Sequence, residues 1–344
     1  MSNLLNRDTP LPVYKEAGGM KYPQFDKHVE TLMNMFWMFN APDLGPDVED
    51  YKMASLEEKT FIENVMRLFT QNEVMVSNGY VKLATIFKPN EIQNWLNYAN
   101  GTEVTHQKAY SLFIETVGLP DSIYTEFLDV NVMNTKTTYL DKAKVKKFEE
   151  YKAMGMTNAE VDREFRRAVA RMLALYGGGA ELVSLYSQFA MLLAYQFQGK
   201  YPGLCQIVEY SIRDEFTHGT VNCELFRIYI AENPDIWDDE LKFDIYEGIR
   251  ELVSYEEATI DYTKPPHMNI DECKQYVRFQ ADQALKQLGM KPNYNVKNPF
   301  KFMDEVTGAV LTDFFSGKVT SYSRKILGSR HALRDKLKSL SGNF

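Results

Sequence analysis

Hydrophobic residues recur every three to four positions along most of the chain, which is the spacing of one face of a helix. The first long segment of this kind starts at Ser55, where Glu58 completes a capping box, and it ends at Lys88. A second segment runs from about residue 90 to 116, before Gly118, a residue typical of the position just after a helix. Alternating strand patterns and glycine-rich phosphate loops are absent from the sequence. The pattern therefore predicts an all-α protein.

The middle of the chain holds the longest helical pattern, and a run of glycines interrupts it. Thr157 and Glu160 form a second capping box, and the helical spacing continues to about Gln198. Each of the three glycines at 177–179 costs about 1 kcal/mol relative to alanine inside a helix, so some feature should require them. The explanations are close approach of another helix, a local distortion beside a functional site, or a plain break between two helices. Further helices are expected at about 204–232, 237–260 and 270–288.

The C-terminal end differs in composition from the rest of the chain. From about Lys291 the sequence contains a segment rich in proline and asparagine, a short helical stretch and then a basic, serine-rich end. Chain ends of this kind are often mobile. We expect residues 1–315 to form one helical domain and residues 316–344 to form a mobile tail.

Composition and charge exclude several classes of protein. A chain of 344 residues with 44% hydrophobic content can bury a sizeable core. The formal net charge is −8 and the Lys and Arg residues are scattered, so nucleic acid is not expected as a partner. No run of about 18 apolar residues predicts a membrane span, and the N-terminus lacks the apolar region of a secretion signal. The three cysteines lie far apart, as expected for reduced thiols in a cytoplasmic protein.

Two of the five histidines stand in the same short motif. Glu103 precedes His106 by three positions, and Glu215 precedes His218 by three positions. On a helix, residues three apart face the same way, so each pair offers a carboxylate and an imidazole to one point. Chance would supply about 0.4 such pairs for five histidines at an ordinary glutamate frequency. A single pair would most often lie on a solvated surface, but the repetition favours a metal site.

The geometry of helical hairpins finds a partner for each motif. Antiparallel helices bring together residues that are equally far from their shared turn. Glu103 follows the turn at position 88 by as many positions as Glu73 precedes it. In the second hairpin, with its turn near position 198, Glu215 follows the turn by as many positions as Glu181 precedes it. Each hairpin therefore offers a glutamate on one arm and a Glu-x-x-His motif on the other.

This combination is the ligand set of ferritin-like dinuclear metal carboxylate proteins. Four glutamates balance the charge of two divalent ions, and oxygen-rich ligands with two imidazoles suit iron or manganese better than zinc. Glu73 or Glu181 alone would more often be a surface carboxylate. Together with the motifs they predict an all-α ferritin-like helical bundle with a dinuclear metal site in its core.

Five stretches of the sequence, in their order and spacing, resemble one known family. They are ETLMNMFW, FTQNEV, TEVTHQKAY, the glutamate at 181 and SIRDEFTHG. The family is the radical-generating small subunit of class I ribonucleotide reductase, and the likeness covers the chain from about residue 25 to its C-terminus. The resemblance implies two sets of metal ligands, of which Glu103 and Glu215 are available to bridge. The sets are Glu73, Glu103 and His106 for one metal ion, and Glu181, Glu215 and His218 for the other.

The resemblance also assigns roles in radical chemistry. Tyr110, one helical turn beyond His106, stands where the family keeps its stable radical. Asp214 and Trp37 match the electron-transfer chain of the family, in which the aspartate joins His106 to a tryptophan near the surface. Tyr322 resembles the mobile relay tyrosine of the family. Without the resemblance, Tyr110 and Trp37 would be interpreted as core aromatics and Asp214 as a helix-surface acid.

The implied activity is that of a ribonucleoside-diphosphate reductase small subunit. Two iron ions are the first expectation for the cofactor, with a mixed manganese and iron pair or two manganese ions as alternatives. The implied partners are a second copy of the chain, giving a homodimer, and the large catalytic subunit, into which the segment ending in Phe344 would dock. An activating flavoprotein is a further partner that the resemblance allows.

The sequence departs from the family at the first metal ligand. The family usually has aspartate where this chain has Glu73, and here one fewer residue separates that position from Glu103. A longer side chain can shift coordination from bidentate to bridging or change the preferred metal, which keeps manganese open. Some relatives hold the oxidising equivalent on the metals alone. The presence of Tyr110 therefore does not decide whether the tyrosine or the metal pair stores the oxidising equivalent.

Three other classes of protein fit parts of the pattern. An iron-storage ferritin shares the site, but its chain is about half as long and needs neither Trp37 nor the tail. A substrate-oxidising dinuclear enzyme, such as a monooxygenase or a ligand-binding oxidase, would show a hydrophobic channel to the metals and act without a large subunit. A metal-free helical scaffold would bind no stoichiometric metal.

Overall fold

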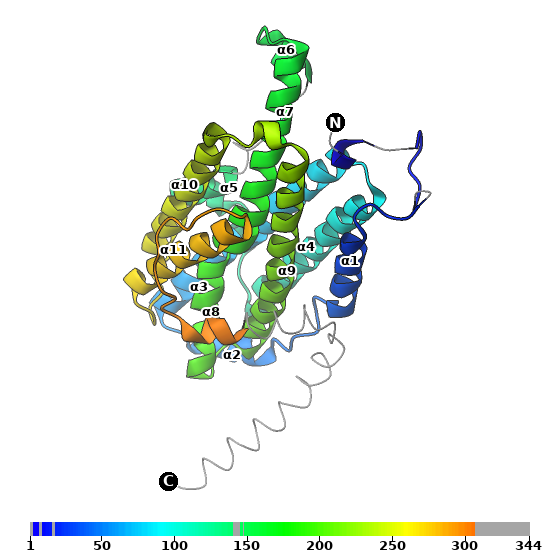
Figure 1. Ribbon diagram of the computed structural model, residues 1–344. Coiled ribbons are helices and arrows are strands. Elements are labelled where there is room, and N and C mark those ends of the chain that lie inside the picture. The colour runs from blue at the N-terminus through cyan, green and yellow to red at the C-terminus, as the bar shows by residue number, and fades with distance from the viewer. Residues whose placement is uncertain (1–2, 7–8, 16–17, 140–144, 147, 307–344) are drawn as a thin grey trace.

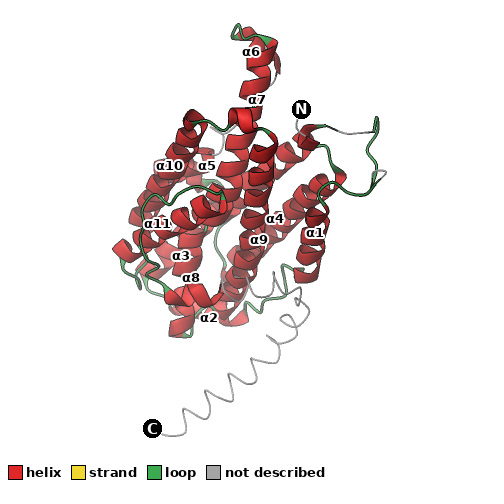
Figure 2. Cartoon of the chain, viewed as in Figure 1, coloured by secondary structure: helices red, strands yellow, loops and turns green. Residues whose placement is uncertain are grey.

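The computed structural model describes residues 3–306 apart from 7–8, 16–17, 140–144 and 147. Within these ranges every regular element is a helix and none is a strand (Figure 2). The long helices pack side by side (Figure 1) and enclose a common hydrophobic core. The predicted all-α bundle is therefore confirmed. The expected tail, residues 316–344 with Tyr322, lies outside the described residues.

Helix α3 (Leu56–Ile86) and helix α4 (Asn90–Val117) form the first predicted hairpin. The side chain of Ser55 accepts a hydrogen bond from the backbone N–H of Glu58, which caps the start of α3. Gly118 ends α4 with a φ of 81°, a left-handed conformation that favours glycine. Both boundaries agree with the sequence prediction because each depends on a single residue of distinctive chemistry.

The second hairpin joins a compound helix to α9 (Pro202–Glu232). The compound helix consists of α7 (Asn158–Leu173), a π-helical segment η5 (Ala174–Ser184), α8 (Tyr186–Leu193) and the 3₁₀ turn η6 (Ala194–Gln198). Thr157 and Glu160 form the predicted capping box at its start. The wider π-helical turns hold Glu181, and π-helical segments are frequent at functional sites.

The glycine run lies in η5, pressed against neighbouring helices. A Cβ on Gly177 would lie 2.7 Å from Cβ of Asn222, and one on Gly178 would lie 2.8 Å from a methyl group of Leu288. Only glycine leaves room at these positions without displacing a neighbour. Close helix approach and local distortion therefore both account for the run, and a plain break between two helices is excluded.

The other helices cover the two hairpins. Helix α1 (Pro23–Met35) packs on α4 and α9, and helices α10 (Asp239–Thr263) and α11 (Ile270–Gln287) pack on η5. Further α-helices are α2 (Gly45–Met53), α5 (Asn131–Thr138) and α6 (Phe148–Ala153), with 3₁₀ turns at Asn3–Leu5, Asp121–Tyr124, Glu126–Asp129 and Pro234–Ile236. Helix α6 and the start of α7 project beyond the body of the bundle (Figure 1).

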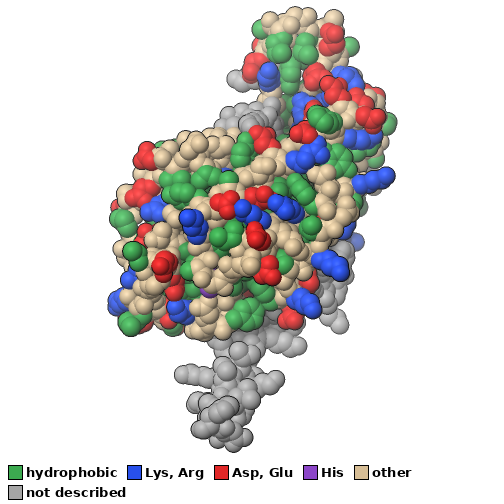
Figure 3. All heavy atoms as spheres, turned by 90° about the vertical axis from the view of Figure 1, so that its left-hand side faces the viewer, with side chains coloured by type: hydrophobic (Ala, Val, Ile, Leu, Met, Phe, Trp, Pro, Cys, Tyr) green, Lys and Arg blue, Asp and Glu red, His purple; other side chains and the backbone are tan. Residues whose placement is uncertain are grey.

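The surface carries charges of both signs. On the face shown in Figure 3, Lys and Arg side chains are interspersed with Asp and Glu. Among the described helices, none has the length and apolar character needed to cross a membrane.

Candidate metal centre

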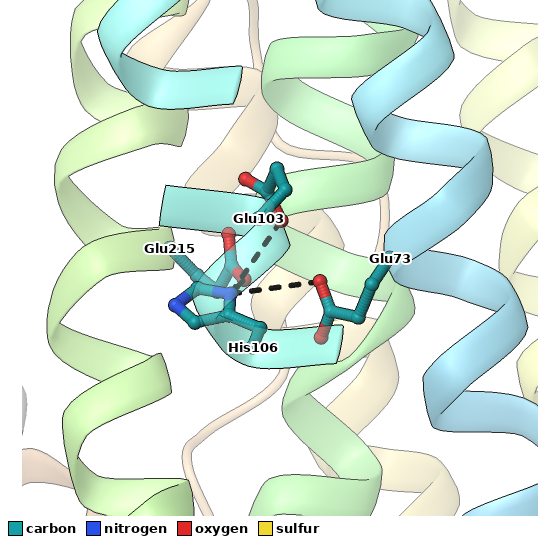
Figure 4. A group of neighbouring side chains, drawn as sticks. All are labelled: Glu73, Glu103, His106 and Glu215. Atoms are coloured by element: carbon teal, nitrogen blue, oxygen red, sulfur yellow. Dashed lines mark ion pairs between the residues drawn. The ribbon is translucent and has the colours of Figure 1, made fainter. Parts of the chain in front are cut away.

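Six side chains from the two hairpins meet in the core of the bundle. They are Glu73 from α3, Glu103 and His106 from α4, Glu181 from η5, and Glu215 and His218 from α9. None is more than 1% exposed. Their donor atoms form two overlapping groups within which all lie less than 4.8 Å apart, and Glu103 and Glu215 belong to both groups. Figure 4 shows the group of Glu73, Glu103, His106 and Glu215.

The distances divide the glutamates into two kinds. Oε2 of Glu103 and Oε1 of Glu215 lie 3.5 and 2.9 Å from Nδ1 of His106. The other oxygens of the same two carboxylates, Oε1 of Glu103 and Oε2 of Glu215, lie 2.8 and 3.1 Å from Nδ1 of His218. Each of these glutamates thus presents one oxygen to each histidine, which is the arrangement of a bridging carboxylate.

The other two glutamates each face one histidine in the ion pairs of the cluster. Oε2 of Glu73 lies 3.6 Å from Nδ1 of His106, and Oε1 of Glu181 lies 3.9 Å from Nδ1 of His218. Each overlapping group therefore has one terminal glutamate, one histidine and two shared glutamates. The geometry accommodates two ions side by side.

Both histidines turn the same ring nitrogen toward the carboxylates. Nε2 of His106 lies 3.1 Å from Oδ2 of Asp214, a carboxylate oxygen, so Nε2 carries the hydrogen in the neutral ring. Nε2 of His218 lies 2.8 Å from Oγ1 of Thr102, which donates its own hydrogen to the carbonyl oxygen of Ala99. Nε2 of His218 is therefore also a donor. In both rings the lone pair of Nδ1 is left for a metal ion.

The buried carboxylates of the cluster favour the binding of cations. Burial, together with neighbouring carboxylates, raises the pKa of Glu73 and of Glu181 well above the usual range. Burial opposes the charged form of His218, but the carboxylates of Glu103 and Glu215 raise its pKa to about 10. Both oxygens of Glu73 are buried without a hydrogen-bond partner. Such orphaned groups each cost about 1–3 kcal/mol or more, and two divalent cations would satisfy them and balance four negative charges.

Tyr110 lies in the core one turn beyond His106, as its spacing predicts. Its side chain is 0% exposed, and its hydroxyl donates a hydrogen bond to Oγ of Ser211 at 3.0 Å. The ring meets that of Phe69 edge to face at a centroid distance of 4.8 Å. Burial, with the charge of Glu73, raises the pKa of Tyr110, so the phenol keeps its proton at neutral pH.

Trp37, Asp214 and His106 form one hydrogen-bonded chain. The indole N–H of Trp37 donates to Oδ2 of Asp214 at 2.8 Å, the same oxygen that faces Nε2 of His106. The indole also stacks on the imidazole, with ring centroids 6.0 Å apart and planes at 25°. The order of the three residues is the one expected from the sequence, and their role in electron transfer stays a prediction.

Two residues at the cluster were not predicted from the sequence. Thr102 accepts from His218, and Tyr80 donates its hydroxyl hydrogen to Oε1 of Glu181. Tyr80 follows Glu73 by seven positions, or about two helical turns, so the spacing could have indicated that both share one face of α3. Thr102 carries no comparable signal, because it directly precedes Glu103 and consecutive residues of a helix do not share a face.

A helical bundle that holds two glutamates and two Glu-x-x-His motifs around one buried point is a ferritin-like dinuclear metal carboxylate protein. Residues 17–299 match the family model described as "Ribonucleotide reductase, small chain". The chain belongs to this family, as its resemblance implied.

Relatives and solved structures agree with this assignment. The chain is 30% identical to "Probable ribonucleoside-diphosphate reductase small subunit 376L" of Invertebrate iridescent virus 6, over 88% of this chain and 92% of that protein. It is 28% identical to "Ribonucleoside-diphosphate reductase subunit M2" of Danio rerio, over 90% and 75% of the two chains. The fold is similar to "Ribonucleotide reductase R2 subunit from Clostridium botulinum", with a TM-score of 0.74, 19% identity and coverage of 88% and 93%. It is also similar to the "Streptococcus sanguinis dimanganese(II)-NrdF" structure, with a TM-score of 0.69, 20% identity and coverage of 87% and 98%.

Proposed function

We propose that this chain is the small subunit of a ribonucleoside-diphosphate reductase. It would store a one-electron oxidising equivalent and pass it to a large subunit that reduces ribonucleotides to deoxyribonucleotides. One observation carries the proposal: hydrogen bonds connect the buried cluster, through His106 and Asp214, to Trp37. A storage ferritin has no need for such a chain.

We assign one metal to Glu73, Glu103 and His106, and the other to Glu181, Glu215 and His218, with Glu103 and Glu215 bridging. The opposed oxygens of the two shared glutamates support this division. Two iron ions are the first choice, and a manganese and iron pair or two manganese ions suit the same oxygen-rich ligands. When bound, the metal pair supplies the oxygen activation that oxidises a nearby side chain by one electron.

Tyr110 is our candidate for that side chain. Removing one electron from its ring releases the phenolic proton. The hydrogen bond to Oγ of Ser211, at 3.0 Å, orients the hydroxyl, and the carboxylate of Glu73, whose charge acts on Tyr110, would be the base that takes up the proton. Complete burial keeps water and reductants from the ring. Trp37 and Asp214 would then conduct the oxidising equivalent toward the surface, and Tyr322 of the tail would continue the route to the large subunit.

The partners follow from the family. The names of the relatives describe small subunits, which supports a separate large subunit, and the fold is shared with the "Rnr4 Homodimer from Saccharomyces cerevisiae" at a TM-score of 0.67. We propose a homodimer that docks to the large subunit through residues 316–344. An activating flavoprotein is a further partner that membership of the family allows.

The test is low-temperature electron paramagnetic resonance with metal analysis. Apo-protein is loaded with Fe(II), or with Mn(II) and Fe(II), and exposed to oxygen beside the variant Tyr110→Phe. We expect about two metals per chain and a tyrosyl signal that the variant lacks. A coupled metal signal that ignores the substitution would move the stored equivalent onto the metals, and absence of stoichiometric metal would overturn the proposal.

A second candidate, a dinuclear oxidase with its own substrate, is favoured by one feature. A cavity of about 530 Å³ is lined by Leu182 and Phe216, the neighbours in sequence of Glu181 and Glu215, and by the rings of Tyr186 and Tyr276. Its size and its aromatic side chains suit a small organic substrate, and Arg227, Lys286 and Asp304 add charged groups to the lining. Oxygen consumption coupled to oxidation of an added apolar compound, without the large subunit, would support this candidate.

A further inference from the structure

Three side chains that are not candidate metal ligands, Tyr80, Asn222 and Trp95, form a hydrogen-bonded array that ends on Glu181. The hydroxyl of Tyr80 (α3) donates to Oε1 of Glu181, and Nδ2 of Asn222 (α9) donates to the Tyr80 oxygen at 2.8 Å. The indole N–H of Trp95 (α4) donates to Oδ1 of Asn222 at 3.0 Å. Tyr80, Asn222 and Trp95 are 2%, 1% and 0% exposed. Three helices thus contribute one side chain each to a buried array.

The chemistry of tryptophan fixes the direction of every bond in this array. An indole N–H can only donate, so the atom of Asn222 that faces Trp95 must be its oxygen. The amide NH₂ of Asn222 then faces Tyr80 and donates to it. Because the Tyr80 oxygen already accepts that bond, its single hydrogen is directed to Glu181.

This direction separates the two oxygens of Glu181. Oε1 is an acceptor held by Tyr80, whereas Oε2 is buried without a hydrogen-bond partner. The terminal glutamate of the other group differs, because both oxygens of Glu73 lack a hydrogen-bond partner. One terminal glutamate is therefore held by a hydrogen bond from outside the cluster, and the other is not.

The same array confines the histidine of the second group. The rings of Tyr80 and Trp95 meet the ring of His218 edge to face, at centroid distances of 5.7 and 6.2 Å and interplanar angles of 72° and 75°. Glu181 and His218 are the two members of that group that the other group does not share. Both are thus held by the array.

Glycines on the neighbouring backbones make the array possible. Gly177 leaves room for Asn222, whose Cβ would lie 2.7 Å from a Cβ at that position. Gly79, directly before Tyr80, brings α3 against the ring of Tyr176, which a Cβ at Gly79 would overlap. Close backbone approach on two sides therefore places the hydroxyl of Tyr80 on Glu181.

We propose that Tyr80, anchored by Asn222 and Trp95, is a positioning residue for the second metal, because its bond to Oε1 holds the carboxylate of Glu181 in one orientation beside His218. The inference rests on the proposed metal-binding function. It makes the two metal positions unequal, because a carboxylate that is already oriented loses less freedom when the ion binds. Loss of the array should weaken the binding of one metal ion and leave the binding of the other unchanged.

The test is anaerobic titration of the apo-protein with Mn(II) alone, followed by electron paramagnetic resonance. Wild-type protein should bind two ions and show the signal of a coupled pair. In Tyr80→Phe we expect one ion to bind as in the wild type and the other about 10–100-fold more weakly, so that isolated Mn(II) appears at the same loading. Asn222→Ala, which removes the anchor, should show a smaller loss of the same kind.

Tyr195→Phe is the matched control. Tyr195 is 1% exposed, and its hydroxyl is buried without a hydrogen-bond partner, so the same substitution removes no bond there. Its Mn(II) titration should equal that of the wild type. Equal helical content by circular dichroism in all variants separates a loss of positioning from a loss of folding.

The outcomes separate this inference from the proposed function. Two Mn(II) ions in the wild type and an unchanged titration in Tyr80→Phe would overturn the positioning role and leave the dinuclear site intact. A wild-type chain that binds no Mn(II) would overturn both. In crystals of the Mn(II)-loaded wild type, the hydroxyl of Tyr80 should still donate to Oε1 of Glu181, and a Glu181 carboxylate that has turned away from Tyr80 contradicts the inference.

Discussion

The indole N–H of Trp37 donates to Oδ2 of Asp214 over 2.8 Å, and the ring is only 7% exposed. Trp37→Phe keeps an aromatic ring but removes this bond, which orients the carboxylate behind His106. We expect two metals per chain to remain and nucleotide reduction with the large subunit to fall about 10–100-fold. Trp237→Phe, in a contact with Phe226 outside the cluster, is the control. Equal activity of the two variants would show that Trp37 takes no part in electron transfer.

Gly177 is required by close packing. In Gly177→Ala the new methyl group would lie 2.7 Å from Cβ of Asn222 and 3.2 Å from its backbone carbon, so the free energy of unfolding should fall by about 1–3 kcal/mol. Gly101→Ala in α4 meets nothing within 4 Å and should instead gain about 0.5–1 kcal/mol. Urea unfolding of both variants checks the opposite signs. An unchanged or higher stability of Gly177→Ala would show that packing at Gly177 adapts.

Lys136 is buried with a charge. Its ammonium group lies 2.9 Å from Oε1 of Glu256 and donates to the carbonyl oxygen of Ser184 at the end of η5, with 1% and 0% of the two charged side chains exposed. Lys136→Met leaves the carboxylate of Glu256 buried without its counter-ion. We expect a loss of about 3–5 kcal/mol in the free energy of unfolding by urea.

The control for Lys136 is an exposed ion pair of the same type. Lys242 lies 3.0 Å from Asp239, whose side chain is fully exposed. Lys242→Met should lower the free energy of unfolding by less than about 1 kcal/mol. Similar losses in the two variants would mean that burial of Lys136 adds nothing to its effect.

Asp238 caps α10 and should make stability depend on pH. The backbone N–H of Leu241, with the charge of Arg167, lowers the pKa of Asp238 from its usual 3.8 to about 2. The unfolded chain therefore takes up the proton first, and the stabilisation is present above pH 3.8 and lost as the pH falls toward 2. Asn also caps helices, so Asp238→Asn removes chiefly the charge.

We expect Asp238→Asn to lower the unfolding midpoint at pH 7, with a difference from the wild type that narrows below about pH 4. Urea unfolding across this range measures it. Asp239→Asn is the matched charge change on a fully exposed neighbour and should have a small effect throughout. A difference that stays constant down to pH 3 contradicts the assigned cause.

The two hairpins were predictable because their helices begin and end at residues with distinctive chemistry. Gly118 and the capping box of Thr157 mark boundaries, and α9, α10 and α11 start and end within three residues of the expected positions. The hydrophobic pattern did not predict α2, whose only buried residue is Asp47. A helix without an apolar stripe has no periodic signal to read.

The candidate site was predictable as far as hairpin symmetry extends. Equal distance from a turn pairs Glu73 with Glu103 and Glu181 with Glu215 without knowledge of helix packing. The partners of Tyr80 and Thr102 lie in the other hairpin, so they depend on how the hairpins dock. The glycines at 177–179 indicated a distortion, but a pattern of 3.6 residues per turn does not distinguish a π-helical segment from an α-helix.

The two shared glutamates come from different hairpins, with Glu103 on α4 and Glu215 on α9. Each of the two groups of donor atoms therefore includes one carboxylate from the other hairpin. If these groups bind the proposed metals, a chain that has folded only one hairpin lacks a bridging ligand, and complete metal uptake would report that the two hairpins have docked. The redox chemistry that we propose would then start only in a folded protein.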